Sequence, residues 1–174
     1  WDLKADREQK MMMALTILEY RRYLMPLVLI VNSQWVKLAK LSEKERINWI
    51  EKAIHQTAKN PSPRHSYYQK VINKYPSFRK FPSYLRRAVI AESLGIVSSF
   101  QTRYREWQSG IRSKRTAKPP RLTAMCQSYP ALYKGQQIKY HDNFQSVDLK
   151  VWSGTDWIWL EKIPIESYGN NEKK

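Results

Sequence analysis

The side chains that could carry acid–base, nucleophilic or metal chemistry are few and scattered in this 174-residue chain. Its three histidines, His55, His65 and His141, and its single cysteine, Cys126, do not fall at the spacings that zinc sites use. Its five glycines are spread too widely to form a phosphate-binding loop. We therefore expect no cofactor and no catalytic residue in this part of the protein.

Four carboxylates near the C-terminal end could in principle hold metal ions for phosphodiester hydrolysis. Asp142, Asp148, Asp156 and Glu161 lie on an expected strand, in turns, or beside lysine. This placement is more typical of solvated strand faces and of turns. We expect binding rather than cleavage from these residues.

Charge gives the clearest functional signal. The net charge is +16, and all of the excess lies in two stretches without any acidic residue, 52–91 with nine Lys/Arg and 107–141 with seven. Soluble surfaces normally mix both signs. A polyphosphate backbone is the commonest partner for such an excess of positive charge, so the expected partners are structured RNA and DNA.

The first candidate patch interleaves cations with aromatic rings between residues 64 and 87. Lys and Arg neutralise phosphates, while aromatic rings stack on unpaired bases. Alternatively, the rings close a core beneath a short helix, and any single aromatic here fits that alternative better. The candidate binding residues of this patch are Arg64, Lys70, Lys74, Tyr75, Arg79, Lys80, Arg86 and Arg87.

The second candidate patch is a cationic connector at 111–121 that ends in proline and arginine. Its alternative is a solvated flexible loop, and both descriptions hold if the loop orders on binding. Its candidate binding residues are Arg112, Lys114, Arg115, Lys118 and Arg121. We expect the two patches to form one continuous positive surface.

Residues 1–110, which must position the first patch, have a helical pattern. Asp6 can cap a first helix, and Pro26 is expected to interrupt it or to start a new one. Ser42 and Glu45 form a capping box before a helix with Ile47, Ile50 and Ile54 on one face. A short helix over 65–75 and a loop over 78–82 are expected next.

The clearest helix extends from Ser83 to about Gln108. Gly95 predicts a kink or a close packing contact, and Gly110 ends the helix. Apolar residues mostly three or four apart indicate one buried face. They are Leu85, Val89, Leu94, Val97, Phe100, Tyr104 and Trp107.

Residues beyond the connector have strand patterns. Alternation over 147–151 and an apolar run over 157–163 predict two strands joined by a hairpin at 153–156, with a weaker strand near 132–140. The predicted fold class is α+β: a helical lobe at 1–110, the connector at 111–121, and a small antiparallel β part at 122–174.

Several classes of protein are excluded. The longest apolar run, about nine residues, is too short to span a membrane, which takes roughly 20. A single cysteine cannot form an internal disulfide. We expect a cytoplasmic, nucleoid-associated protein of unspecified oligomeric state, and Trp1 in place of Met indicates a piece of a longer chain.

Short motifs along most of the chain resemble the recognition lobe and wedge domain of TnpB-type transposon-encoded nucleases, relatives of the type V CRISPR effectors. In the helical part the motifs are ADREQ (5–9), FPSYLRRA (81–88), LG (94–95), SS (98–99) and Trp107. Beyond it they are PPR (119–121), YPALYKG (129–135), VDLKVW (147–152) and WIW (157–159).

The resemblance implies a wedge β-barrel with the helical lobe inserted after its first strand, and both would cradle a guide RNA and the RNA–DNA heteroduplex. In that family a separate RuvC-like domain with an acidic triad holds divalent metal and cuts DNA. The chain stops near Lys174, before any such domain, so the nuclease activity is not carried over, and the first wedge strand would precede or barely include Trp1. In that family, base pairing between guide RNA and target DNA reads the DNA sequence, and the protein recognises the shape of the nucleic acid through a basic channel.

Two alternatives stay open. A repressor or recombinase DNA-binding domain would read duplex DNA, with the helix from Ser83 long enough to lie in a major groove. A protein-interaction module would use the tryptophan-rich hairpin at 152–159 as its partner-binding face.

Overall fold

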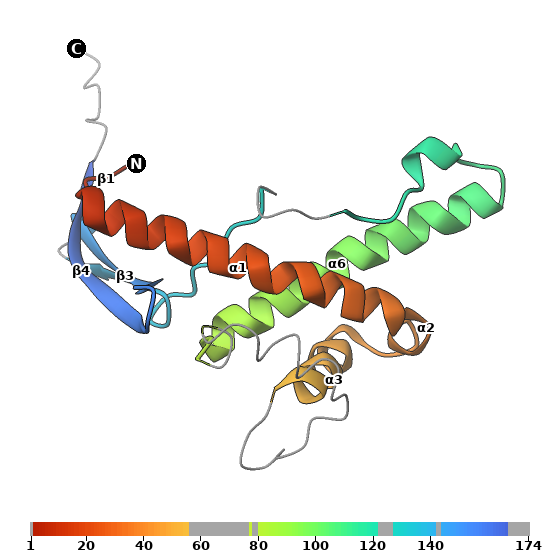
Figure 1. The fold of residues 1–174 in the computed structure, drawn as a ribbon, viewed down its shortest axis with the longest axis horizontal. Coiled ribbons are helices and arrows are strands. Elements are labelled where there is room, and N and C mark those ends of the chain that lie inside the picture. The colour runs from red at the N-terminus through yellow and green to blue at the C-terminus, as the bar shows by residue number, and fades with distance from the viewer. Residues whose placement is uncertain (1, 56–76, 78–79, 122–126, 142–143, 167–174) are drawn as a thin grey trace.

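The structure is a computed structural model that describes residues 2–55, 77, 80–121, 127–141 and 144–166. Two long helices, α1 (Arg7–Ser33) and α6 (Ser83–Gln108), cross in the middle of the molecule (Figure 1). A small sheet lies at the N-terminal end of α1, and the last turns of α6 extend to the opposite end of the molecule. No helix among these residues combines the length and hydropathy needed to cross a bilayer.

Helix α1, Arg7–Ser33, begins at a capping box in which Asp6 accepts the N–H of Gln9 and the Gln9 side chain accepts the N–H of Asp6. The expected break at Pro26 is wrong, because the helix continues through it. Proline costs about 3 kcal/mol inside a helix. Leu24, Leu27 and their neighbours are almost fully buried, and this burial offsets that cost.

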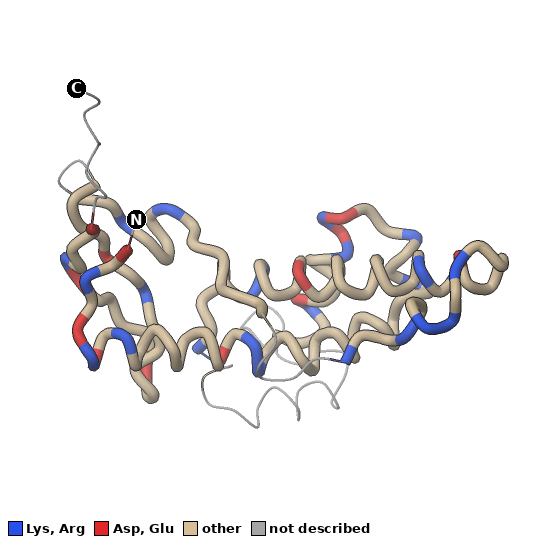
Figure 2. The backbone as a smooth tube through the Cα atoms, turned by 90° about the horizontal axis from the view of Figure 1, so that it is seen from above, with Lys and Arg blue, Asp and Glu red and all other residues tan. Residues whose placement is uncertain are grey.

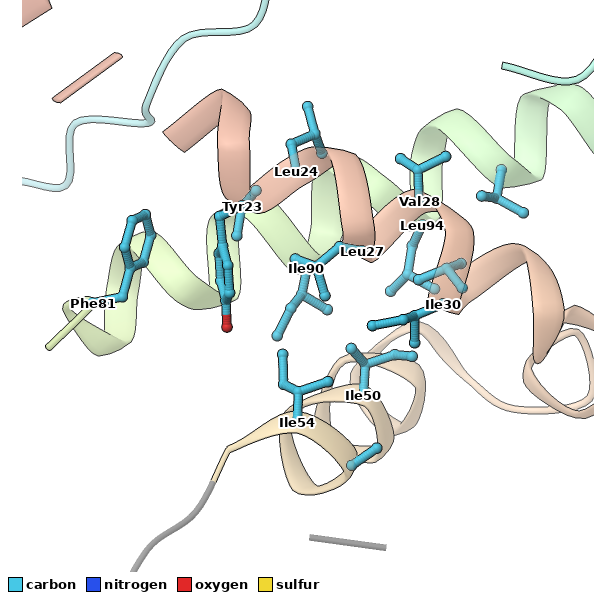
Figure 3. Packing of buried hydrophobic residues seen from close by; sticks show 14 of the residues in the cluster. Tyr23, Leu24, Leu27, Val28, Ile30, Ile50, Ile54, Phe81, Ile90 and Leu94 are labelled. Carbon is cyan, nitrogen blue, oxygen red and sulfur yellow. The ribbon is translucent and has the colours of Figure 1, made fainter. Parts of the chain in front are cut away.

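The main core lies between α1, α6 (Ser83–Gln108) and α3 (Glu43–Ile54). Ile50 and Ile54 of α3 point toward Ile90 of α6 and toward α1 (Figure 3). The capping box of Ser42 and Glu45 is confirmed at the start of α3. A short helix α2, Trp35–Leu38, leads from α1 toward it.

The predicted helix from Ser83 is confirmed as α6. Gly95 makes no close packing contact: it is exposed, and a Cβ there would meet open space. Gly110 follows the end of the helix at φ +77°, which favours glycine. The apolar stripe is buried as far as Phe100, but Tyr104 and Trp107 lie beyond the core.

The strands form a four-stranded antiparallel sheet in the order β1-β4-β3-β2, which confirms the α+β fold class. Their bounds are β1 Asp2–Leu3, β2 Ile138–His141, β3 Ser146–Trp152 and β4 Trp157–Glu166. The predicted hairpin turn joins β3 and β4, with Gly154 at φ +104°. Strand β1 comes from the N-terminus, so the helices lie in the chain between the first strand and the other three.

Asp148 is not on a solvated strand face, contrary to expectation. It is 7% exposed and lies where a bulge sets one residue of β3 against two of β4. Its Oδ1 accepts the N–H of Lys162, which has a φ of +50°, and its Oδ2 lies 2.8 Å from Nε2 of His141. The carboxylate thus stabilises the bulge.

The helices and the sheet pack directly against each other. Thr16 of α1 is buried, and its Oγ1 accepts the N–H of Trp152 at 2.7 Å while donating to the Met12 carbonyl. Trp157 of β4 meets the Phe81 ring edge-on, with 5.2 Å between centroids. These contacts fix the orientation of the sheet relative to α1 and α6.

Candidate nucleic-acid interface

Most of the first predicted patch lies outside the described residues, namely Arg64, Lys70, Lys74, Tyr75 and Arg79. The structure describes its other three members. Lys80 is half exposed, and its ammonium lies 2.9 Å from Oδ2 of Asp156 in the β3–β4 turn. This pair joins the helical part to the sheet.

Arg86 and Arg87 of α6 share one carboxylate, that of Glu51 on α3. Arg86 Nε lies 3.1 Å from Glu51 Oε1, and Arg87 Nη1 lies 2.8 Å from Oε2. Arg86 also donates to the Phe81 carbonyl at 3.0 Å. The Arg86 side chain is 9% exposed, so its guanidinium is neutralised inside the fold by Glu51. The Arg87 side chain is 43% exposed.

The Arg86 charge also acts on its surroundings. His55, directly after α3, is partly buried. Burial first, and then the positive charge of Arg86, hold the pKa of the His55 imidazole below its ordinary value. A neutral imidazole is the form that tolerates a neighbouring guanidinium.

Helix α6 separates these residues from the connector. Its 26 residues span about 39 Å at 1.5 Å per residue, with Arg86 near one end and the connector after the other. One continuous positive surface stays a prediction, because most of the first patch lies outside the described residues.

The connector begins with a tight helix end. The N–H of Gly110 bonds to the Trp107 carbonyl and that of Ile111 to the Glu106 carbonyl, as glycine-terminated helix ends do. The chain then reverses through a short 3₁₀ helix, η1 (Lys114–Thr116), and returns alongside α6 (Figure 1). Arg112 pairs with Glu106 at 2.6 Å.

The remaining connector cations are free of carboxylates. Among the described residues, none of Lys114, Arg115, Lys118 and Arg121 has an acidic partner, and all four are exposed. Lys and Arg positions are spread along the backbone and include several at the end of the molecule away from the sheet (Figure 2). The only acid between residues 103 and 121 is Glu106, which Arg112 already neutralises.

An open hollow of about 510 Å³ lies between the end of α6 and the connector. It is lined by Tyr104, Trp107, Lys114, Arg115, Ala117, Lys118 and Pro119. Ala117 is buried, at 5% exposure, which holds the connector against the helix. The hollow places three predicted binding residues beside two aromatic rings.

Tyr104 and Trp107 were predicted to be buried, not to be part of a site. Their position past Phe100, next to an acid-free stretch rich in arginine and lysine, is the sequence signal that could have indicated exposure.

The sheet carries a second group of cations that the sequence did not single out. Lys139 of β2 lies with its ammonium 4.0 Å from the Trp159 ring centroid, and Lys150 of β3 lies at 5.7 Å. Because Trp159 is on β4, three strands contribute to this cluster. Cross-strand pairing, which a sequence pattern does not reveal, brings them together.

No group of three or more His, Cys, Asp or Glu within the described ranges could hold a metal ion. The best-placed pair, His141 and Asp148, is part of the bulge of the sheet. The described residues of the candidate interface present positive charge and aromatic rings.

Comparison with curated proteins and with solved structures gives no match. A family model does match, and it covers residues 1–153, from β1 through the helices and the connector to the end of β3. The match therefore includes both the basic connector and the hollow. Because the match covers residues 1–153 of the 174, the chain belongs to the Aq_aa04 family.

Proposed function

We propose that this chain is the nucleic-acid-recognition region of an RNA-guided DNA endonuclease encoded by a transposon, similar to the TnpB type. It cradles a guide RNA and its heteroduplex with target DNA and does not itself cut. A divalent metal would belong to a nuclease domain elsewhere in the parent protein.

The observation that carries the proposal is the connector, where four exposed cations have no acidic partner among the described residues. Unpaired cations repel one another, so keeping four within eight residues, 114–121, favours a surface that meets an anion. Phosphates at regular spacing along a strand supply that anion.

The chain order of the sheet gives independent support. In the TnpB-type resemblance the helical lobe follows the first wedge strand. Here β1, at Asp2–Leu3, pairs with β4, and all the described helices follow it before β2 begins. The four strands that the structure describes form an open sheet, with β1 and β2 at its edges.

The alternative function, a domain that binds duplex DNA with α6 in the major groove, is disfavoured by the way α6 packs in the fold. Between residues 85 and 100 of α6, only Gly95 and Ser99 are exposed as whole residues, and the partly exposed Arg87 side chain is paired with Glu51. A recognition helix needs a free face of side chains that reach base edges. Helix α6 instead contributes its faces to the core with α1 and α3.

Salt dependence of binding tests the proposal. Four connector contacts predict a slope of about −3.6 in log K against log salt, a loss of roughly 100-fold between about 50 and 200 mM. The measurement is fluorescence anisotropy on a structured RNA hairpin, an RNA–DNA hybrid and a DNA duplex. Tighter binding to RNA and hybrid than to any DNA duplex is expected.

The double variant Arg115→Gln/Lys118→Gln should flatten this slope by about 1.8 units. Its matched control, Lys40→Gln/Lys44→Gln, removes the same charge from exposed positions between α2 and the start of α3 and should leave the slope unchanged. A flat salt dependence in the unmodified protein would refute the proposal, and binding that survives high salt and nuclease treatment would favour a protein partner.

A further inference from the structure

The end of α6 carries an aromatic ladder that leaves the core. The rings of Phe100 and Tyr104 lie 5.8 Å apart between centroids, and those of Tyr104 and Trp107 lie 5.3 Å apart. The spacings of four and then three residues put all three on one helix face. Phe100 is buried, but Tyr104 is 36% exposed and Trp107 is partly exposed.

These outer rings face the hollow together with three cations. Lys114, Arg115 and Lys118 line it, and no carboxylate does. The Lys114 ammonium lies 5.7 Å from the Trp107 ring centroid, within the range of a cation–π contact. The volume of about 510 Å³ falls within the range of small-ligand sites, roughly 300–1,000 Å³.

We propose that this hollow binds one unpaired nucleotide of a single strand, with its base packed against the rings of Tyr104 and Trp107 and its phosphates held by Arg115 and Lys118. The inference rests on the proposed function and goes further, because it selects single-stranded nucleic acid at this site. A base inside a duplex has both faces covered by its neighbours, whereas an unpaired base offers a free face to a ring. Loss of one such ring contact is therefore expected to weaken single-strand binding by about tenfold or more.

The test uses the 174-residue chain with an oligothymidylate of about 12 nucleotides and an RNA–DNA hybrid of equal length, both fluorescently labelled. The variants are Tyr104→Leu and Trp107→Leu, which keep apolar bulk and remove the rings. The matched control is Trp49→Leu, since Trp49 lies under the Lys37 ammonium at 4.9 Å on another part of the molecule.

Tyr104→Leu and Trp107→Leu should each weaken single-strand binding by about tenfold or more and change hybrid binding less than about twofold. Trp49→Leu should change neither. Equal losses for single strand and hybrid would overturn the inference, as would no loss at all. If Trp107→Leu lowers the melting temperature, the more exposed Tyr104→Leu decides alone.

The two proposals fail differently. If the unmodified protein shows no salt-dependent binding to any of the probes, the proposed function fails. If it binds them all with a steep salt slope but the two ring variants bind like the unmodified protein, only the nucleotide site fails.

Discussion

Arg86 is the residue for which the sequence motif and the tertiary structure give opposite expectations. The sequence offers it as a phosphate contact, whereas the structure joins it to Glu51 and to the Phe81 carbonyl inside the fold. Replacing it with methionine removes the charge and keeps an unbranched apolar side chain. We expect Arg86→Met to destabilise the fold and to leave nucleic-acid binding intact.

The expected loss of stability depends on the Glu51 carboxylate, which Arg86→Met leaves without one of its two cationic partners. Breaking a buried ion pair from one side costs about 3–5 kcal/mol. Glu51 keeps its contact with Arg87 at 2.8 Å, so the lower end, about 3 kcal/mol, applies here. For a chain of this size each kcal/mol shifts the melting temperature by about 2–4 °C, so a fall of about 6–12 °C is expected.

Thermal unfolding followed by circular dichroism and the salt slope from anisotropy measure the two effects separately. The control, Arg115→Met, should shift the melting temperature by no more than about 2 °C, because Arg115 is exposed, and should flatten the slope by about 0.9 units. A structural role for Arg86 is refuted if Arg86→Met has the melting temperature of the unmodified protein and flattens the salt slope as much as Arg115→Met does.

Three further predictions concern stability. Thr16→Val removes the acceptor of the buried Trp152 N–H and should cost about 1–3 kcal/mol in urea unfolding; an unchanged midpoint would mean that the helix–sheet contact does not depend on this bond. Gly95→Ala should raise the melting temperature by about 2–4 °C, because its Cβ meets open space in mid-helix, and a decrease would contradict this. Burial works to raise the pKa of Asp148, but the Lys162 N–H and the His141 imidazole outweigh it and hold that pKa below its ordinary value. The stability from this carboxylate is therefore present above about pH 4 and lost as the pH falls further. The free energy of unfolding, measured in urea at about pH 6 and about pH 3, should therefore fall less between these two pH values for Asp148→Asn than for the unmodified protein.

Local signals in the sequence predicted most of the elements well. The capping boxes at Asp6 and at Ser42, the stripe from Leu85, and the turn before Trp157 all predicted elements that the structure contains. Each of these signals lies within a few residues of the element that it specifies. Pro26 was the exception, because the burial of its neighbours, a tertiary effect, outweighed its local preference.

The candidate site was less predictable for the same reason. Charge composition indicated which stretches are basic, but it could not indicate which cations have an acidic partner. Glu51 lies 35 residues before Arg86, and Asp156 lies 76 residues after Lys80. Both pairings depend on how α3 and the sheet pack around the start of α6.

The amino-acid sequence by itself determined that this protein is an α+β chain with a large positive excess confined to two stretches, because charge and periodicity are properties of neighbouring residues. Only the tertiary structure decided which of those charges face solvent and which stabilise the fold. It also decided that Tyr104 and Trp107 line a hollow rather than a core, because the packed helices end before the last turns of α6. Burial and ion pairing depend on distances between residues far apart in the chain, which composition and local pattern do not contain.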